Sequence, residues 1–237
     1  MPTTSSIQVA VADGRFHCHV AWPDTPGLRP VIVVLQEIFG VNAGIRSIAD
    51  AYAEKGYIAV APDLFWRDAP GLSLSEDKDG DWERAFALYN AYDIGAGIED
   101  IAAVVAAARR LPGANGKVGV TGYCLGGLLT YLSAARTNAD AFVAYYGGGT
   151  DRYVAEADAI RAPLLYHLAG ADEYIGPTAQ EAIRAALARR PGRELHVYPG
   201  RDHAFARPGG HHYHAGDAIL ANARTDAFFA RHLAPQA

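Results

Sequence analysis

The sequence predicts an α/β fold with a mostly parallel central sheet, helices on both faces of that sheet and an N-terminal antiparallel hairpin. The first supporting observation is that short, wholly apolar runs alternate with longer segments whose apolar residues recur at helical spacing. The second is that glycine, proline or aspartate follows several of these segments, as expected where strands and helices end. The third is Asp13-Gly14 between two strand-like segments, which is a strong hairpin signal.

Each element follows from its local pattern. The hairpin strands are expected at residues 7–12 and 15–22, and buried strands at 31–35 and 57–61. Further strands are expected at 117–121, 141–146, 163–168 and 194–198. Helices are expected at residues 45–55, 82–110, 124–135, 178–189 and 215–231, with a break in the second near Gly95 and Gly97. Residues 68–81, rich in glycine, proline, serine and acids, are expected to form a loop. Because such alternation builds parallel sheets, a ligand is expected beyond the carboxyl ends of the strands.

Length and composition are those of one globular domain over residues 1–237. Half of the residues are hydrophobic and a fifth are charged, which excludes a disordered tail, a collagen-like repeat and a small disulfide scaffold. The net charge of −5 argues against nucleic acid or an anionic membrane as the main partner. The uncharged run 118–135 contains Gly126-Gly127, which favours a buried strand, turn and helix over a membrane span. We expect a small-molecule partner and a monomer or small homo-oligomer.

The cysteines and histidines give little sign of a disulfide or metal framework. Cys18 and Cys124 are too few for a disulfide scaffold, and the first residues lack the pattern of a secretory signal, so we expect a reduced, cytoplasmic protein. Cys18 occupies an apolar strand position and is expected to be inert. His211, His212 and His214 are joined by no acid or cysteine at ligand spacing, so a solvated loop and no metal are expected.

The segment around Cys124 carries the strongest chemical signal. Gly122-Tyr-Cys124-Leu-Gly126 follows a predicted strand and precedes a predicted helix, as in the strand–turn–helix elbow that presents a nucleophile in α/β-hydrolases. The sharp turn requires tiny residues two positions on either side of the nucleophile. It also places the sulfur at a helix N-terminus, which favours the thiolate, and aims the Leu125 N–H at a developing oxyanion. The alternative is a buried structural cysteine beside a glycine-rich helix start.

Two later residues follow predicted strands in the order that such hydrolases require, which is nucleophile, acid and base. Asp172 comes after strand 163–168, and His203 comes after strand 194–198. A thiol nucleophile benefits from a base, and the base from an orienting acid. Glu173 is a rival acid with a less direct strand-end placement. Asp202 is a poor orienting group for His203, because side chains of sequence neighbours point apart.

The segment after strand 31–35 also ends on chemistry-bearing residues. In α/β-hydrolases the corresponding loop supplies the second oxyanion-hole N–H, for which Ile38 is the natural donor. Glu37 is either an ordinary turn residue or a carboxylate that interacts with the Cys124 thiol. The residue by itself does not decide between these two interpretations.

With these segments assembled, the chain resembles the dienelactone hydrolase family of α/β-hydrolases. The segments that carry the resemblance are Gln-Glu-Ile-Phe-Gly-Val-Asn at 36–42, Ala-Pro-Asp-Leu at 61–64, Gly-Lys-Val-Gly at 116–119, Gly-Tyr-Cys-Leu-Gly-Gly at 122–127, Tyr-Tyr-Gly at 145–147, Asp172 and His-Ala-Phe-Ala-Arg at 203–207. They cover nearly the whole chain. The resemblance implies an α/β-hydrolase fold and cofactor-free opening of the dienelactone ring to maleylacetate, in bacterial breakdown of chlorinated aromatics.

The resemblance also implies roles for individual residues. Cys124, His203 and Asp172 would form the catalytic triad, with an oxyanion hole from the N–H groups of Ile38 and Leu125. Glu37 would contact the thiol in the resting enzyme and shift when substrate binds, so that His203 then holds the thiolate.

One part of the family pattern is altered. Arg207 matches an arginine that binds the substrate carboxylate, and Tyr146 is also expected to contact substrate. A second carboxylate-binding arginine and a tyrosine are replaced here by Trp82 and Phe86, and Arg84 lies nearby on another side of the helix. Losing a charge-assisted hydrogen bond costs about 1–3 kcal/mol. Larger or less charged esters or lactones that rest on Trp82 and Phe86 are therefore plausible substrates.

The sequence thus predicts a cysteine-dependent hydrolase of lactones or activated carboxylic esters that works through a thioester. Because thiolates expel poor leaving groups slowly, enol lactones and aryl esters are expected to react better than alkyl esters or amides. The alternatives are a carboxylesterase for larger or uncharged esters, a non-catalytic binding protein of the same fold, and a redox- or peroxide-sensing thiol. Stoichiometric alkylation of Cys124 that is slowed in His203→Ala separates the hydrolase from the binding protein. Burst acylation by an aryl ester separates it from the sensing thiol.

Overall fold

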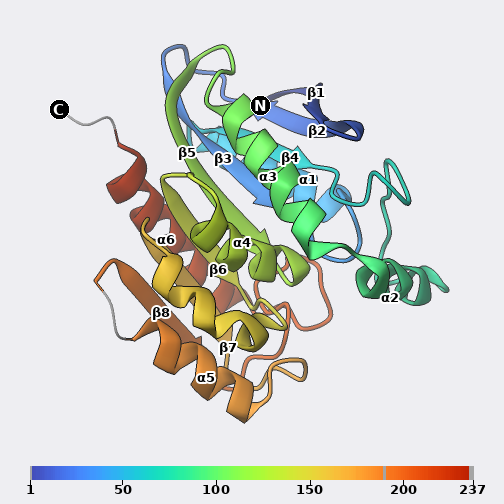
Figure 1. The fold of residues 1–237 in the computed structure, drawn as a ribbon, viewed down its shortest axis with the longest axis vertical. Coiled ribbons are helices and arrows are strands. Elements are labelled where there is room, and N and C mark those ends of the chain that lie inside the picture. The colour runs from blue at the N-terminus through green and yellow to red at the C-terminus, as the bar shows by residue number, and fades with distance from the viewer. Residues whose placement is uncertain (1, 189–190, 235–237) are drawn as a thin grey trace.

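The computed structural model describes residues 2–188 and 191–234, and these form one eight-stranded sheet between two layers of helices (Figure 1). The strand order is β1-β2-β4-β3-β5-β6-β7-β8. β1, β2 and β4 pair antiparallel, and every pair from β4 through β3 to β8 is parallel. The strands are β1 (Thr3–Val11), β2 (Gly14–Trp22), β3 (Arg29–Leu35), β4 (Ile58–Pro62), β5 (Ala114–Tyr123), β6 (Ala141–Tyr145), β7 (Leu164–Ala169) and β8 (Arg193–Tyr198).

The helices bury their apolar sides in two separate clusters, one on each face of the sheet. Ile101 of α3, Leu129 of α4 and Ile183 of α5 belong to the first cluster, and Ile45 of α1 and Phe229 of α6 belong to the second. The helices are α1 (Ala43–Glu54), α2 (Asp81–Ala91), α3 (Ile94–Ala108), α4 (Leu125–Arg136), the 3₁₀ helix η1 (Thr150–Ala159), α5 (Pro177–Leu187) and α6 (Ala215–Leu233). The expected arrangement of helices on both faces is confirmed, and α2 lies apart at one side of the molecule (Figure 1).

The hairpin is confirmed, but its turn differs from the prediction. Val11 pairs with Gly14, so the two loop residues are Ala12 and Asp13 rather than Asp13 and Gly14. Gly14 lies against the Trp66 ring, where an added Cβ would stand 2.9 Å from two ring carbons. The glycine therefore serves a close approach of backbone to an aromatic ring, which the sequence pattern did not distinguish from a turn.

The long predicted helix at 82–110 is two helices, and the break falls before the expected glycines. α2 ends at Ala91 and α3 begins at Ile94, because the Asp93 side chain accepts a hydrogen bond from the Ala96 N–H and caps the new helix. Gly97 lies inside α3, where its missing side chain makes room for Tyr92. A Cβ there would stand 2.1 Å from the Tyr92 hydroxyl.

Two further differences concern helix limits. η1 was not predicted, because a 3₁₀ helix lacks the 3.6-residue apolar period that the sequence analysis used. The predicted helix at 178–189 corresponds to α5, and residue 189 lies outside the described residues. The uncharged run 118–135 forms most of β5 and the buried helix α4. Across residues 2–188 and 191–234, no helix has both the length and the apolar character needed to cross a bilayer.

The parallel strands deliver their following loops to one edge of the sheet. β3 leads into Glu37, β5 into Cys124, β6 into Tyr146, β7 into the loop of Asp172 and β8 into the loop of His203. Since the carboxyl ends of parallel strands meet at the same edge, these chemically active residues converge although they lie far apart in the sequence.

Candidate active site

Cys124 stands on a strained turn between β5 and α4. Its backbone has φ 56° and ψ −116°, a conformation that a non-glycine residue adopts at a cost of about 1–3 kcal/mol. The glycines on either side permit the turn. A Cβ on Gly122 would stand 2.2 Å from the Gly126 carbonyl oxygen, and one on Gly126 would stand 2.5 Å from the Leu35 carbonyl oxygen. The turn holds the sulfur at the N-terminus of α4.

His203 and Asp172 form a buried pair beside this turn. His203 Nδ1 lies 2.9 and 3.1 Å from the two carboxylate oxygens of Asp172. The carboxylate also accepts hydrogen bonds from the Tyr174 and Ile175 backbone N–H groups, at 2.9 and 3.2 Å. Asp172 is therefore fixed by its own loop and in turn orients the imidazole. Asp202 accepts from the His203 backbone N–H and not from the ring.

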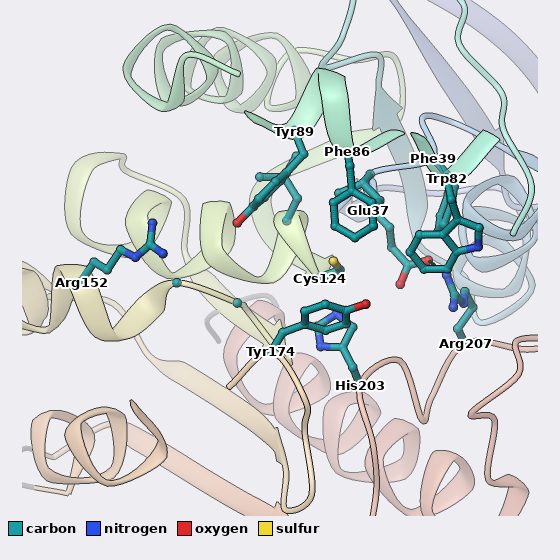
Figure 2. A pocket seen from close by; sticks show the side chains of 14 residues that line it. Glu37, Phe39, Trp82, Phe86, Tyr89, Cys124, Arg152, Tyr174, His203 and Arg207 are labelled. Carbon is teal, nitrogen blue, oxygen red and sulfur yellow. Dashed lines mark hydrogen bonds and ion pairs between the residues drawn. The ribbon is translucent and has the colours of Figure 1, made fainter. Parts of the chain in front are cut away.

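The environment of His203 strongly favours its protonated form. Burial of the ring opposes a positive charge, but the Cys124 thiolate and the Asp172 carboxylate outweigh that effect and raise the pKa of His203 to about 10. In Figure 2, Cys124 and His203 stand in the same cavity, and Tyr174 lies beside the imidazole. The Tyr174 ring meets that of His203 edge-on, at 4.9 Å between centroids. The arrangement suits a thiolate–imidazolium pair.

Two residues that share the cavity lining with Cys124 have backbone N–H groups of interest. The Gly126 N–H donates to the Gln36 carbonyl oxygen at 3.0 Å, which holds the loop after β3 against the start of α4. Within the described residues, neither the Ile38 nor the Leu125 N–H donates a hydrogen bond, and both residues line the cavity that contains Cys124. Free N–H groups from two adjoining segments are what an oxyanion hole requires.

Glu37 is paired with an arginine. Its Oε2 lies 3.2 Å from Arg207 Nη1, whereas Oε1 has no hydrogen-bond partner among the described residues. Arg207 also contacts Glu76 through Nη2, at 2.5 Å. The expected resting contact of Glu37 with the thiol is not among the hydrogen bonds of the structure, in which the carboxylate turns to Arg207.

The cavity above Cys124 has a volume of about 220 Å³ and a partly aromatic wall. Trp82 stacks on Phe86 with 5.5 Å between ring centroids, and Phe39 meets the Trp82 ring edge-on at 5.0 Å. In Figure 2, Trp82 and Arg207 stand at one end of the cavity and Tyr89 and Arg152 at the other. The lining consists of Glu37, Ile38, Phe39, Trp82, Phe86, Tyr89, Cys124, Leu125, Gly148, Gly149, Arg152, Tyr174, His203 and Arg207.

Two residues considered in the sequence analysis lie elsewhere. Tyr146, expected to contact substrate, is fully buried and absent from the cavity lining. Its ring contacts His203 instead, at 5.1 Å between centroids, so it supports the imidazole from the protein side. Its backbone has φ 37°, and its ring belongs to the buried cluster that also holds Phe205, at the edge of a neighbouring cavity. Arg84 is also absent from the lining, and Trp82 and Phe86 line the cavity without it.

Sequence reasoning missed four of the lining side chains, of which Phe39 directly follows Ile38 in the chain. Tyr89 follows Phe86 by three residues on α2, so helical spacing was a usable signal for it. Tyr174 follows Asp172 by two residues in the same loop. Arg152 lies in η1, and no pattern in the sequence placed that segment at the cavity.

Cys18 and the histidine cluster lie outside this cavity. Cys18 is buried in β2, and burial raises the pKa of its thiol to about 12, as expected of an inert cysteine. His212 groups with Asp202, ten residues earlier in the same connection between β8 and α6, and with Glu173 from the loop after β7. Exposed acids gather in this way without an ion, so the group by itself does not make a metal site.

Comparison with known proteins identifies the family. The model of the dienelactone hydrolase family matches residues 16–233. A carboxymethylenebutenolidase of Pseudomonas putida is 37% identical over 96% of this chain and 96% of its own length. A protein of Azospirillum brasilense is 44% identical over 93% of this chain and 95% of its own.

Solved structures agree. A protein from Klebsiella pneumoniae has a TM-score of 0.87 at 29% identity, covering 98% of this chain and 100% of its own. The dienelactone hydrolase of Anabaena variabilis shares the fold, with a TM-score of 0.70 at 18% identity and 98% of both chains covered. The expected α/β-hydrolase fold is thereby confirmed. The chain belongs to the dienelactone hydrolase family and is a hydrolase of carboxylic ester or lactone bonds.

Proposed function

We propose that the chain hydrolyses lactones or activated esters with Cys124 as nucleophile, His203 as proton carrier and Asp172 as the group that orients His203. One observation carries the proposal. Cys124, in a strained strand-to-helix turn, lines the same cavity as His203. The Nδ1 atom of His203 is held by the buried Asp172 carboxylate. A structural cysteine needs neither the strained backbone nor the proton partner.

In the first half of the reaction, the Cys124 thiolate attacks the carbonyl carbon and forms a C–S bond. The carbonyl electrons move to oxygen, and the resulting oxyanion accepts hydrogen bonds from the Ile38 and Leu125 N–H groups. The C–O bond to the leaving group then breaks. The leaving oxygen takes the proton of the His203 imidazolium, so a thioester and a neutral imidazole remain. In a lactone, the leaving oxygen stays attached to the acyl chain.

In the second half, neutral His203 removes a proton from water while the water oxygen attacks the thioester. The new oxyanion occupies the same two N–H groups. It collapses by breaking the C–S bond, which restores the thiolate beside the imidazolium. The acid leaves with one oxygen from water and releases its proton to solvent.

The leaving group decides which substrates react. A tetrahedral intermediate on sulfur expels either the thiolate or the alcohol oxygen, and the thiolate departs readily. Product therefore forms efficiently only when the alcohol side is also a good leaving group, as in enol lactones and aryl esters. The aromatic wall of Trp82 and Phe86 provides an apolar surface for such a substrate. We propose enol lactones or aryl esters as the substrate class.

The test uses 4-nitrophenyl butyrate in stopped flow and iodoacetamide labelling in parallel. The wild type is expected to release a burst of nitrophenolate equal to the enzyme concentration, and Cys124→Ala to lose both burst and turnover. Cys124→Ser is expected to retain little activity, because the site stabilises a thiolate rather than activating a hydroxyl. Full activity in Cys124→Ala would overturn the proposal.

Cys18 supplies the internal control. Because burial raises the pKa of the Cys18 thiol to about 12, only Cys124 is expected to react with iodoacetamide in the folded protein. Native wild type should take up one equivalent and Cys124→Ala none, whereas Cys18→Ala should label and turn over like the wild type. Slower labelling in His203→Ala would link the thiol's reactivity to the imidazole.

A further inference from the structure

Arg207, a cation that lines the catalytic cavity, has both terminal nitrogens of its guanidinium occupied. Arg207 lines the catalytic cavity, and its Nη1 and Nη2 contact Glu37 and Glu76 respectively. Its guanidinium carbon also lies 5.5 Å from the centre of the Phe39 ring. Burial opposes the charge of Arg207, but the two carboxylates outweigh that effect and raise its pKa. The guanidinium is therefore compensated within the protein.

Glu76 is held firmly in this pairing. Its carboxylate is only 9% exposed, and its second oxygen, Oε1, accepts from the His211 N–H at 2.9 Å. Its backbone carbonyl accepts from the Trp82 indole N–H at 3.1 Å. Trp82, which forms part of the aromatic wall, thus also fixes Glu76, the acid that contacts Arg207.

Glu76 approaches Arg207 from outside the catalytic cavity. It lines a neighbouring cavity of about 310 Å³, which shares Glu37, Phe39 and Arg207 with the first. Arg207 therefore stands in the partition between the two cavities, and Glu76 engages it from the far side. Two carboxylates against one guanidinium leave this end of the catalytic cavity unfavourable for a further anion.

We propose that Glu76 is a specificity-determining residue, which occupies the anion-binding capacity of Arg207 and thereby excludes substrates that carry a carboxylate near the reacting carbonyl. A carboxylate-bearing substrate would have to displace Glu37 or Glu76 from a charge-assisted hydrogen bond and approach the other. A neutral substrate meets only the aromatic wall. This inference rests on the proposed function, since it names the substrate charge that the same site accepts.

The experiment compares two matched esters, 4-nitrophenyl butyrate and the mono-4-nitrophenyl ester of glutaric acid, after subtraction of spontaneous hydrolysis. The wild type is expected to favour the butyrate. Glu76→Gln keeps the size and one oxygen for the His211 N–H but removes the charge. It is expected to raise the glutarate-to-butyrate ratio of kcat/KM at least tenfold, chiefly through KM for the glutarate ester.

Two further variants identify the cause. Asp79→Asn removes the same charge from the same loop at an exposed residue, and no hydrogen bond or ion pair of Asp79 is found among residues 2–188 and 191–234. It should change the ratio less than twofold. Adding Arg207→Gln to Glu76→Gln should abolish the gain, because the released guanidinium is the group that binds the new carboxylate. An equal gain in Asp79→Asn, or an unchanged ratio in Glu76→Gln, would overturn the inference.

A binding assay decides the matter independently of turnover. Free glutarate should slow iodoacetamide labelling of Cys124 in Glu76→Gln and Glu76→Ala and have no such effect in the wild type. Equal protection of wild type and variants counts against the role of Glu76. If no variant hydrolyses the butyrate ester, the proposed function fails, while the protection assay still tests whether Glu76 blocks an anion site.

Discussion

The Asp172 carboxylate meets His203 Nδ1 with both oxygens, at 2.9 and 3.1 Å, and the other ring nitrogen of His203 has no hydrogen-bond partner within residues 2–188 and 191–234. Because Tyr174 and Ile175 donate backbone N–H groups to the same carboxylate, Asp172 is fixed independently of the histidine. Asp172 thus sets the orientation of the ring and favours a proton on Nδ1. The second nitrogen, Nε2, is therefore free for the proton transfers that the proposed function assigns to it.

Asp172→Asn is expected to lower kcat for 4-nitrophenyl butyrate on the order of 10²–10⁴-fold. An amide keeps an acceptor for the backbone N–H groups but withdraws the negative charge that supports the imidazolium. KM should change much less, since Asp172 does not line the cavity. Steady-state kinetics with active-site titration provide the measurement.

Asp202→Asn is the matched control for that variant. Asp202 lies next to His203 in the chain and accepts from its backbone N–H, yet no hydrogen bond joins it to the ring. Its replacement should alter kcat less than threefold. A loss comparable with that of Asp172→Asn would show that charge near His203, rather than the Nδ1 hydrogen bond, is what matters.

The raised pKa of His203 predicts a particular dependence of stability on pH. The pKa of His203 in the folded state, about 10, lies above the ordinary histidine pKa of 6.5, so the folded state holds a proton that the unfolded chain has released. The resulting stabilisation is fully present below about pH 6.5 and is lost as the pH rises toward 10. Urea unfolding between these limits should show a falling free energy of unfolding in the wild type.

Cys124→Ala isolates this contribution, because the thiolate is the largest influence that raises the pKa of His203. Its unfolding free energy should fall less steeply over the same range, and the imidazole signals of His203 in NMR should titrate at lower pH. His167 does not interfere. Burial lowers its pKa, so it changes the free energy of unfolding only below about pH 6.5. Parallel curves for wild type and variant would contradict the assignment.

Local patterns in the sequence identified the features that a single segment determines. The glycines around Cys124 predicted the turn, because each glycine is required by a contact within its own strand–turn–helix unit or with the adjoining strand. The order Cys124, Asp172, His203 was readable because parallel strands deliver their loops to one edge. These inferences need only the spacing of residues and the alternation of strand and helix patterns, and both can be read from the sequence.

Features that depend on contacts between distant segments could not be read in the same way. Glu76 reaches Arg207 across 131 residues, and nothing near either residue indicates the pair. Tyr146 packs against His203 and Phe205, which come from a much later segment, and nothing near it in the sequence indicates that contact. Arg152 lies on a 3₁₀ helix, whose irregular spacing gave no periodic signal.

Gly126→Ala is expected to damage both fold and activity. Its Cβ would stand 2.5 and 2.6 Å from the carbonyl oxygens of Leu35 and Gln36, which are backbone atoms and yield little. We expect a loss of about 1–3 kcal/mol in unfolding free energy, with a displaced loop at Ile38 and a fall of about 10²-fold in kcat.

At Gly148 an added Cβ meets no heavy atom within 4 Å, so Gly148→Ala should leave the unfolding free energy nearly unchanged. Equal stability of the two variants would refute the packing argument.

Phe86→Leu tests the aromatic wall without disturbing Glu76, because the neighbouring Trp82 holds the Glu76 carbonyl and Phe86 does not. Phe86 stacks on Trp82 at the cavity and is 36% exposed. An aromatic contact contributes about 0.5–1.5 kcal/mol beyond area burial, so kcat/KM for 4-nitrophenyl butyrate should fall about 2- to 10-fold. Vinyl butyrate, which has an enol leaving group but no ring, should be affected less.

Tyr213→Leu, which removes an exposed aromatic ring outside the cavity lining, is the control and should leave the hydrolysis of both substrates unaffected. Equal losses for the aryl and vinyl esters in Phe86→Leu would mean that the ring supports the position of α2 rather than the substrate.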